Sequence, residues 1–302
     1  MKIKWAFYVC VFSMTVLLGI VNDIVADTNV SGYISSDTTW TQANSPYVAT
    51  GNVIVRSGVT LSIEPGVTVK FDGDKSLQIY GTLIAKGTSA EKITFTRNSN
   101  DKWGYILFND SSIDTAYDND GNYTGGSILE YCVVEYAGGS SVENNGAVRM
   151  DNAHHFINYC TIKNNSASGI YAWSLSETLK ITYNTINNNT VSSTAAGASY
   201  GGIYCGGGIN IISNNTVSNN NVFTTSSSGI GYGGGIYCNG GTNTIFNNII
   251  SSNIISSSSY GCGGGICCYS GINTISNNMI SNNSISSGKG GGIYCSGGTN
   301  TI

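Results

Sequence analysis

A short motif with alternating apolar positions recurs along the chain. Gly-Gly-Ile-Tyr-Cys occurs at 201–205, 234–238 and 291–295, and Gly-Gly-Ile-Cys-Cys occurs at 264–268. Looser copies elsewhere in the chain keep the aliphatic residue of this motif. We call that residue the first marker of each repeat, and the first markers are Ile106, Val148, Ile170, Ile203, Ile236, Ile266 and Ile293. Successive side chains of a strand point to opposite faces, so the marker and the residue two places later share a face. The motif therefore predicts one short strand per repeat.

The residue two places after each first marker is apolar or cysteine. These residues are Phe108, Met150, Ala172, Cys205, Cys238, Cys268 and Cys295. We expect them to point inward beside the markers, because a half-buried strand keeps its apolar side chains on one face. The residues between the two positions should point outward, and they are Leu107, Arg149, Tyr171, Tyr204, Tyr237, Cys267 and Tyr294.

Two further aliphatic markers follow the first at fixed intervals. The second comes nine residues later, as from Ile203 to Ile212, and the third comes five residues after the second, as at Val217. Fixed intervals predict three short strands per repeat. The distance between first markers varies from 22 to 33 residues from Val148 on, and the variation falls after the third strand, where we expect a loop.

The second and third markers are five residues apart, so in one straight strand they would point to opposite faces. We expect both to point inward, and the chain must therefore turn a corner between them. The residue three places past the second marker is asparagine in four repeats, at Asn184, Asn215, Asn248 and Asn278. Asparagine tolerates the left-handed backbone of a tight bend. In register, and with neighbouring strands about 4.8 Å apart, these side chains should hydrogen-bond along the axis as a ladder.

This pattern resembles that of the right-handed parallel β-helix family, whose members include pectate lyases, polygalacturonases and many secreted repeat proteins. The resemblance covers residues 53–302 and implies an all-β, right-handed parallel β-helix with three short strands per coil. Residues 27–52, which include Trp40, would form an N-terminal cap, since an open solenoid end exposes strand edges. The helix would be truncated in the middle of a coil at Ile302.

The first residues are typical of a targeting segment. Lys2 and Lys4 precede an apolar run over 5–21, and Ala26 offers a cleavage point, which predicts a signal peptide over 1–26. A retained membrane anchor is the alternative. We expect a secreted or extracellular-surface protein, where disulfides are permitted.

Composition excludes several partners. Only 10% of the residues are charged, against about 25% in an average domain, and the net charge is −4. No basic patch indicates a nucleic acid, and none indicates a membrane surface once the signal peptide is removed.

Acid–base chemistry has few candidate residues. Beyond Glu177 the chain has no Asp, Glu, Arg or His, so a catalytic site of the usual kind would have to lie before that residue. The best cluster is Arg149, Asp151 and His154, with Glu143 and His155 beside it. The resemblance places the substrate cleft of the lyases along the strand that carries Arg149. The structural alternative is a surface ion pair and two solvated histidines.

The sequence also contains a candidate metal site. Asp114, Asp118 and Asp120 resemble a calcium loop in part, but position 116 is Ala and position 127 is Ser where that pattern has acidic ligands. An acidic loop without metal is the alternative, so no cofactor is expected unless the chain is a calcium-assisted lyase.

Cys132 and Cys160 occupy the corner position in successive repeats, where a disulfide can form. We expect the inward cysteines at 205, 238, 268 and 295 to pack as core residues, because no His or acidic partner lies nearby.

The most suggestive surface feature is the outward tyrosine column of Tyr171, Tyr204, Tyr237 and Tyr294. Exposed rings can stack on sugar faces, although tyrosines can also stabilise a strand surface by stacking on one another. The sequence favours a non-catalytic extracellular repeat protein that binds a polysaccharide or another surface along its long side. The alternative is a polysaccharide lyase or glycoside hydrolase of the pectate-lyase-like group, with its site before residue 177 or in a missing C-terminal region. A purely structural stalk is a third hypothesis that the sequence does not separate from the first.

Overall fold

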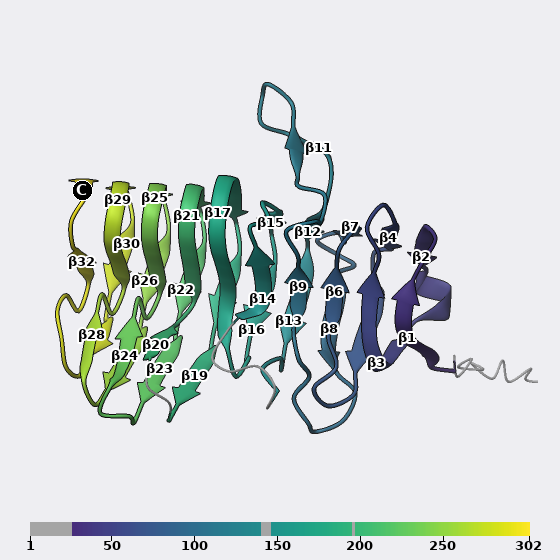
Figure 1. The fold of residues 1–302 in the computed structure, drawn as a ribbon, viewed down its shortest axis with the longest axis horizontal. Coiled ribbons are helices and arrows are strands. Elements are labelled where there is room, and N and C mark those ends of the chain that lie inside the picture. The colour runs from purple at the N-terminus through teal and green to yellow at the C-terminus, as the bar shows by residue number, and fades with distance from the viewer. Residues whose placement is uncertain (1–25, 140–145, 195–196) are drawn as a thin grey trace, which may run out of the picture.

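The computed structural model describes residues 26–139, 146–194 and 197–302, and it is a parallel β-helix (Figure 1). Coils stack along the long axis from the N-terminal strands to the C-terminal ones. Apart from Ala26, the predicted signal peptide lies outside the described residues. Within the described ranges no helix has the length and apolar character needed to cross a membrane.

Three columns of parallel strands run the length of the stack, as predicted. The first-marker column contains β6 (Leu77–Ile79), β9 (Ile106–Phe108), β14 (Gly146–Asp151) and β32 (Ile293–Cys295). The second contains β2 (Thr38–Trp40), β4 (Thr60–Ile63), β7 (Thr82–Lys86), β12 (Ile128–Glu130), β15 (Phe156–Asn158) and β33 (Thr299–Thr301). The third contains β5 (Thr68–Phe71), β8 (Ile93–Arg97), β13 (Cys132–Glu135), β16 (Thr161–Lys163), β18 (Thr185–Asn187), β22 (Thr216–Ser218), β26 (Ile249–Ser251) and β30 (Met279–Ser281).

Some strands bend through a corner and belong to two columns. In the C-terminal half these are β17 (Ser168–Thr182), β21 (Ile203–Ser213), β25 (Ile236–Phe246) and β29 (Ile266–Ser276), which join the first column to the second. At the N-terminal end, β1 (Thr28–Ile34) and β3 (Tyr47–Val55) join the third column to the first. A short 3-10 helix, η1 (Gln42–Asn44), follows β2.

The predicted cap region is built from strands at the N-terminal end of the stack. β1 pairs in parallel with β3, and β2 pairs in parallel with β4. Trp40 is buried and stacks on Tyr47 at 4.9 Å between ring centroids. Both rings belong to the apolar core at this end of the stack.

The interior is one continuous apolar column, as the alternation predicted. The first markers from Ile106 to Ile266 and the inward residues from Phe108 to Cys268 are all buried. Ile293 and Cys295, in the last coil, are partly exposed and still pack against this core. Each coil therefore stabilises its neighbours by the apolar area that stacking removes from water.

Asparagine ladders line the corners of the coil. Asn184, Asn215, Asn248 and Asn278 are joined by amide–amide hydrogen bonds of 2.9–3.0 Å, which confirms the predicted ladder. The left-handed residue at this corner is the preceding one, for example Asn214 at φ 57°, and not the ladder residue itself. Two further ladders, which the sequence interpretation missed, contain Asn165, Asn189, Asn220, Asn253 and Asn283 in one case and Asn210, Asn243, Asn273 and Asn300 in the other.

The segment after the third strand is more ordered than the predicted loop. In the later coils it forms a fourth column of parallel strands, β19 (Thr190–Ser193), β23 (Asn221–Thr224), β27 (Ile254–Ser257) and β31 (Ser284–Ile285). A fifth column follows, with β20 (Gly197–Tyr200), β24 (Gly229–Tyr232) and β28 (Tyr260–Cys262). Between β9 and β12, an antiparallel hairpin of β10 (Ala116–Tyr117) and β11 (Tyr123–Gly125) projects from the stack (Figure 1).

Candidate functional site

The predicted tyrosine surface is mostly buried, and this corrects the sequence interpretation. Tyr204 and Tyr237 are only 8% and 4% exposed, and Tyr171 and Tyr294 are half-buried. Tyr200 and Tyr232, from the fifth column, stack over them, with ring centroids 4.4 Å apart for Tyr200 and Tyr204. The alternation correctly sends the predicted tyrosines out of the main core, but the returning strands cover them with a second apolar layer.

A disulfide replaces one tyrosine pair in this second layer. Cys262 aligns with Tyr232 and Cys267 aligns with Tyr237, and the two cysteines are bonded to each other. The disulfide therefore fastens the fifth column to the main sheet at the place where neighbouring coils use stacked rings.

The predicted bridge between Cys132 and Cys160 is not formed, and both residues are free thiols. Their side chains point into the corner positions that asparagines occupy in later coils. The Cys132 thiol donates to the carbonyl of Ala85 at 3.4 Å, and the Cys160 thiol donates to that of Leu129 at 3.3 Å. Each thiol thus satisfies a carbonyl of the preceding coil instead of bonding to the other sulfur.

Another tyrosine stack is open to solvent. Tyr131, Tyr159 and Tyr183 lie in successive coils, each two residues after the second marker, with ring centroids 4.8 Å apart and interplanar angles of 4° and 14°. Tyr159 is 38% exposed and Tyr183 is 50% exposed. The centroid separation equals the spacing of neighbouring strands, about 4.8 Å, so each ring lies against the ring of the next coil and part of each side chain remains exposed. We call these three residues the tyrosine stack.

The backbone of the tyrosine stack is strained. Its members have φ values of 49°, 51° and 57°, a left-handed conformation that costs a residue with a Cβ roughly 1–2 kcal/mol. The next coils place Asn214 and Asn247 at the same position with the same backbone, and asparagine adopts this conformation readily. Tyrosine at these corners is therefore not required by the turn, and its recurrence at one register position is the sequence signal that could have revealed it.

A row of polar groups runs beside the tyrosine stack. Glu130 lies 3.6 Å from the Lys86 ammonium and accepts a hydrogen bond from the Asn158 amide at 2.8 Å. Asn158 in turn accepts a hydrogen bond from the Thr182 hydroxyl at 2.9 Å. Partial burial, together with the neighbouring tyrosines and Glu130, raises the pKa of the Tyr159 hydroxyl, so this hydroxyl remains a hydrogen-bond donor at neutral pH. Asn158 and Thr182 are buried, whereas Glu130 is partly exposed, so one carboxylate lies at the surface beside the partly exposed rings.

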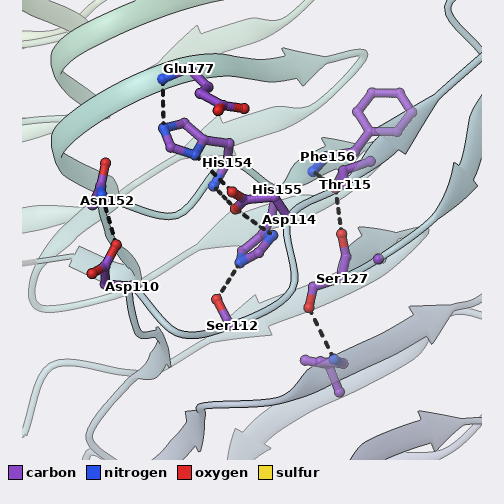
Figure 2. Close-up of polar contacts among 12 residues, drawn as sticks. Asp110, Ser112, Asp114, Thr115, Ser127, Asn152, His154, His155, Phe156 and Glu177 are labelled. Atoms are coloured by element: carbon purple, nitrogen blue, oxygen red, sulfur yellow. Dashed lines mark hydrogen bonds and ion pairs between the residues drawn. The ribbon is translucent and has the colours of Figure 1, made fainter. Parts of the chain in front are cut away.

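The two histidines of the predicted catalytic cluster are buried (Figure 2). His154 Nε2 accepts hydrogen bonds from the backbone N–H groups of Ser176 and Glu177 at 3.1 and 2.9 Å. Its Nδ1 must therefore carry the proton and donate to Asp114 at 3.2 Å. Both ring nitrogens are occupied, so His154 joins two coils to the inserted hairpin segment and is not available for proton transfer.

The structure does not bring the catalytic candidates together. The Arg149 guanidinium lies over the Tyr105 ring, 4.1 Å from its centroid, and Nε donates to the carbonyl of Gly146. The described residues contain no ion pair between Arg149 and Asp151. Glu143, which was expected beside the cluster, lies outside the described residues.

Two of the three calcium candidates are engaged in separate contacts. The Asp114 carboxylate is bound to His154, and the Asp118 carboxylate accepts hydrogen bonds from the backbone of Asp120 and Asn122 at the hairpin tip. No group of three metal-binding side chains occurs in the described parts of the chain.

The buried histidine pair predicts sensitivity to acid. His155 is fully buried, and its Nε2 lies 2.8 Å from the Ser112 hydroxyl, which itself donates to the carbonyl of Asn109. Burial lowers the pKa of His155 from 6.5 to about 3. Below pH 6.5 the unfolded chain binds a proton at this residue that the folded chain does not, so acid favours unfolding.

We therefore expect the free energy of unfolding to fall by about 1.4 kcal/mol per pH unit below pH 6.5 on account of His155. Burial acts to raise the pKa of Asp114, but its hydrogen bonds to His154 outweigh this and lower it. Protonation of Asp114 at still lower pH therefore adds to the loss. Urea unfolding at pH 7 and pH 4.5 measures the effect. The variant His155→Gln should show a smaller difference between the two pH values, and an unchanged difference would contradict the assignment.

Comparison with known proteins adds one partial similarity. A segment of 69 residues is 42% identical to Protein bark beetle of Drosophila melanogaster; this covers 23% of the chain and only 2% of the length of that protein. No protein-family profile matches the chain. No solved structure matches it either.

Proposed function

We propose that this chain is a secreted or cell-surface β-helix protein, without catalytic activity, that binds a polysaccharide along its long side through Tyr131, Tyr159 and Tyr183. The observation that carries the proposal is three parallel and partly exposed rings held in register by the coils. Aromatic side chains of this kind present apolar ring area together with a hydroxyl that can donate a hydrogen bond.

The surroundings of the tyrosine stack fit a sugar ligand. A sugar ring has an apolar face of C–H groups and a rim of hydroxyls, so it needs an aromatic platform with donors and acceptors beside it. The exposed ring area supplies the platform, and the partly exposed Glu130 carboxylate supplies an acceptor next to it, held in place by a hydrogen bond from the buried Asn158. Because the stack follows the axis of the coils, a ligand chain lying parallel to the axis would contact all three rings.

The charges near the tyrosine stack favour a neutral glycan. Glu130 is paired with Lys86, and Glu135, in the neighbouring third column, is paired with Lys163 at 3.3 Å. Paired charges leave little net attraction for a strongly acidic chain.

One other feature supports the extracellular part of the proposal. The Cys262–Cys267 disulfide is of a kind that persists in oxidising compartments.

We also propose that the coils wind in the right-handed sense and that the chain is related to the pectate-lyase-like superfamily. Crossovers between parallel strands of one sheet are right-handed in about 98% of cases.

Substituting asparagine for two of the tyrosines tests the proposal. Asparagine occupies this corner in the next coils with the same backbone, so the double variant Tyr159→Asn, Tyr183→Asn should change the free energy of unfolding by less than about 1 kcal/mol, because relief of strain offsets the lost ring stacking. Binding to a neutral polysaccharide selected on a glycan array should weaken at least about tenfold, or by roughly 1.4 kcal/mol. Affinity electrophoresis and thermal melting measure the two quantities.

A matched control uses a tyrosine elsewhere on the surface. Tyr269 is 51% exposed, as open as Tyr183, and it lies in β29, far from the stack in the sequence. Tyr269→Asn should leave binding unchanged. Equal binding by the wild type and the double variant would refute the proposed site.

A further inference from the structure

A second surface is regular in two dimensions. It lies on the second-column part of β21, β25 and β29 and on β33, where the strands are paired in register. Its first column is Ile209, Thr242, Ile272 and Thr299. Its second column, two residues further along each strand, is Ile211, Thr244, Thr274 and Thr301. All eight positions hold isoleucine or threonine, and we call them the Ile/Thr array.

The Ile/Thr array is held rigidly from beneath. The residue between the two columns is asparagine in each of the four strands, and it points away from the array. Asn210, Asn243, Asn273 and Asn300 are joined along the axis by hydrogen bonds of 2.7–2.8 Å. The β-branched side chains above them have restricted rotation about χ1. The methyl and hydroxyl groups are therefore fixed on a grid of about 4.8 Å between strands and about 6.7 Å along each strand.

The exposure of this face is unusual. Ile209 and Ile272 are 47% and 55% exposed, although isoleucine is among the residues most often buried. The other outward columns of these coils do not repeat the pattern. On the third column one set of outward residues is Thr216, Ile249 and Met279, which differ in size and shape, and the other is Ser218, Ser251 and Ser281, which have no methyl groups.

The array also has no charge. Its four rows contain only uncharged residues. In the chain after Glu177 the only charged side chains are Lys289 and Lys180, and Lys180 pairs with Ile211 at the edge of the array, where its ammonium lies over the Tyr117 ring. A charged ligand would gain nothing from such a face, whereas an uncharged lattice matches it. Fixed methyl groups order the adjacent water, and hydroxyls at a regular spacing can hydrogen-bond that water in place.

We propose that the Ile/Thr array binds ice. The two spacings of the array are of the same size as distances that recur between water oxygens on the faces of ice crystals. A regular and uncharged grid of methyl and hydroxyl groups can therefore hold a layer of water that merges with the crystal lattice. This activity is independent of the polysaccharide proposal, since the array and the tyrosine stack share no residue.

Growth of ice in the presence of the protein tests the inference. The wild type should inhibit recrystallisation in a frozen sucrose solution and should be enriched in a slowly grown ice hemisphere. The variant Thr242→Lys, Thr244→Lys places two charged side chains on the array and should raise the lowest inhibitory concentration at least about tenfold. The variant Thr242→Val, Thr244→Val keeps the β-branched shape and should retain most of the activity.

The control Thr216→Lys lies on the neighbouring outward column and is partly buried, as Thr244 is. It should retain full activity, and thermal melting of each variant verifies folding. An inactive wild type would overturn the proposal, as would equal loss of activity in Thr216→Lys. Binding of the array to crystalline cellulose or chitin without any effect on ice would also overturn it.

Discussion

Replacing Asn220 by alanine is expected to lower the free energy of unfolding by about 4 kcal/mol, because it removes one rung of a fully buried ladder and leaves several polar groups without partners. The Asn220 amide donates to the carbonyl of Ile186 and to Asn253, both at 3.0 Å. Its side-chain carbonyl accepts hydrogen bonds from the backbone N–H and from the side-chain amide of Asn189. Asn220 is buried completely, so bulk water does not reach these contacts in the folded protein.

The neighbouring residue supplies the control for this variant. Asn219 is exposed and left-handed, with φ 54°, so Asn219→Gly should change stability by only a few tenths of a kcal/mol. Chemical denaturation of both variants measures the difference. A loss below about 1 kcal/mol for Asn220→Ala, typical of a surface substitution, would show that the ladder does not stabilise the coils.

Introducing a methyl group at Gly202 is expected to destabilise the fold by about 3 kcal/mol, as in an overpacked core. A Cβ at this position would lie 2.6 Å from the carbonyl oxygen of Gly235 and 2.7 Å from Cγ1 of Val217. The first contact is with the backbone of the next coil, which cannot move without breaking the register of the strands. The paired glycines of the repeated motif thus allow consecutive coils to approach closely before each first marker.

A glycine in open surroundings gives the comparison. At Gly125, in β11 of the hairpin, an added Cβ would meet no atom within 4 Å, and the backbone is not left-handed. Gly125→Ala should therefore leave stability within about 0.5 kcal/mol of the wild type. Equal melting temperatures for Gly202→Ala and Gly125→Ala would contradict the close approach of the coils.

The main columns of the fold could be predicted because they depend on local alternation. Ile203, Ile212 and Val217 recur at fixed intervals, and a side chain's face follows directly from its place in the strand. The first asparagine ladder followed from the same register. The ladder through Asn189 and Asn220 could have been found in the same way, since each of these residues lies three places after the third marker of its coil.

The second layer could not be predicted from alternation alone. Whether Tyr204 meets solvent depends on the path of the chain after the third strand, and the spacing to Tyr200 and Tyr232 varies between coils. The Cys262–Cys267 disulfide was missed for the same reason, because it joins a column that the repeat did not reveal. His154 was expected in a solvated turn, but Asp114 reaches it from an insert 40 residues earlier. Such long-range contacts leave no periodic signal.

The tyrosine stack illustrates the opposite case. Tyr131, Tyr159 and Tyr183 share a register position, so their alignment was readable, but their left-handed backbone was not. Tyrosine is an unfavourable residue for that backbone, and an assignment by propensity would place asparagine or glycine there. Local rules therefore fail at the surface that we propose to be functional, which is where departures from them are expected.

The central claim is that sugar binds at the tyrosine stack and not along the outward face of the first column. The most direct test is an NMR titration of ¹³C-tyrosine-labelled protein with the selected neutral oligosaccharide. Single Tyr→Phe variants assign the resonances. We expect the ring signals of Tyr131, Tyr159 and Tyr183 to shift together with one dissociation constant while those of Tyr105 and Tyr171 stay in place. Shifts confined to Tyr105 and Tyr171, beside Arg149, would contradict binding at the stack.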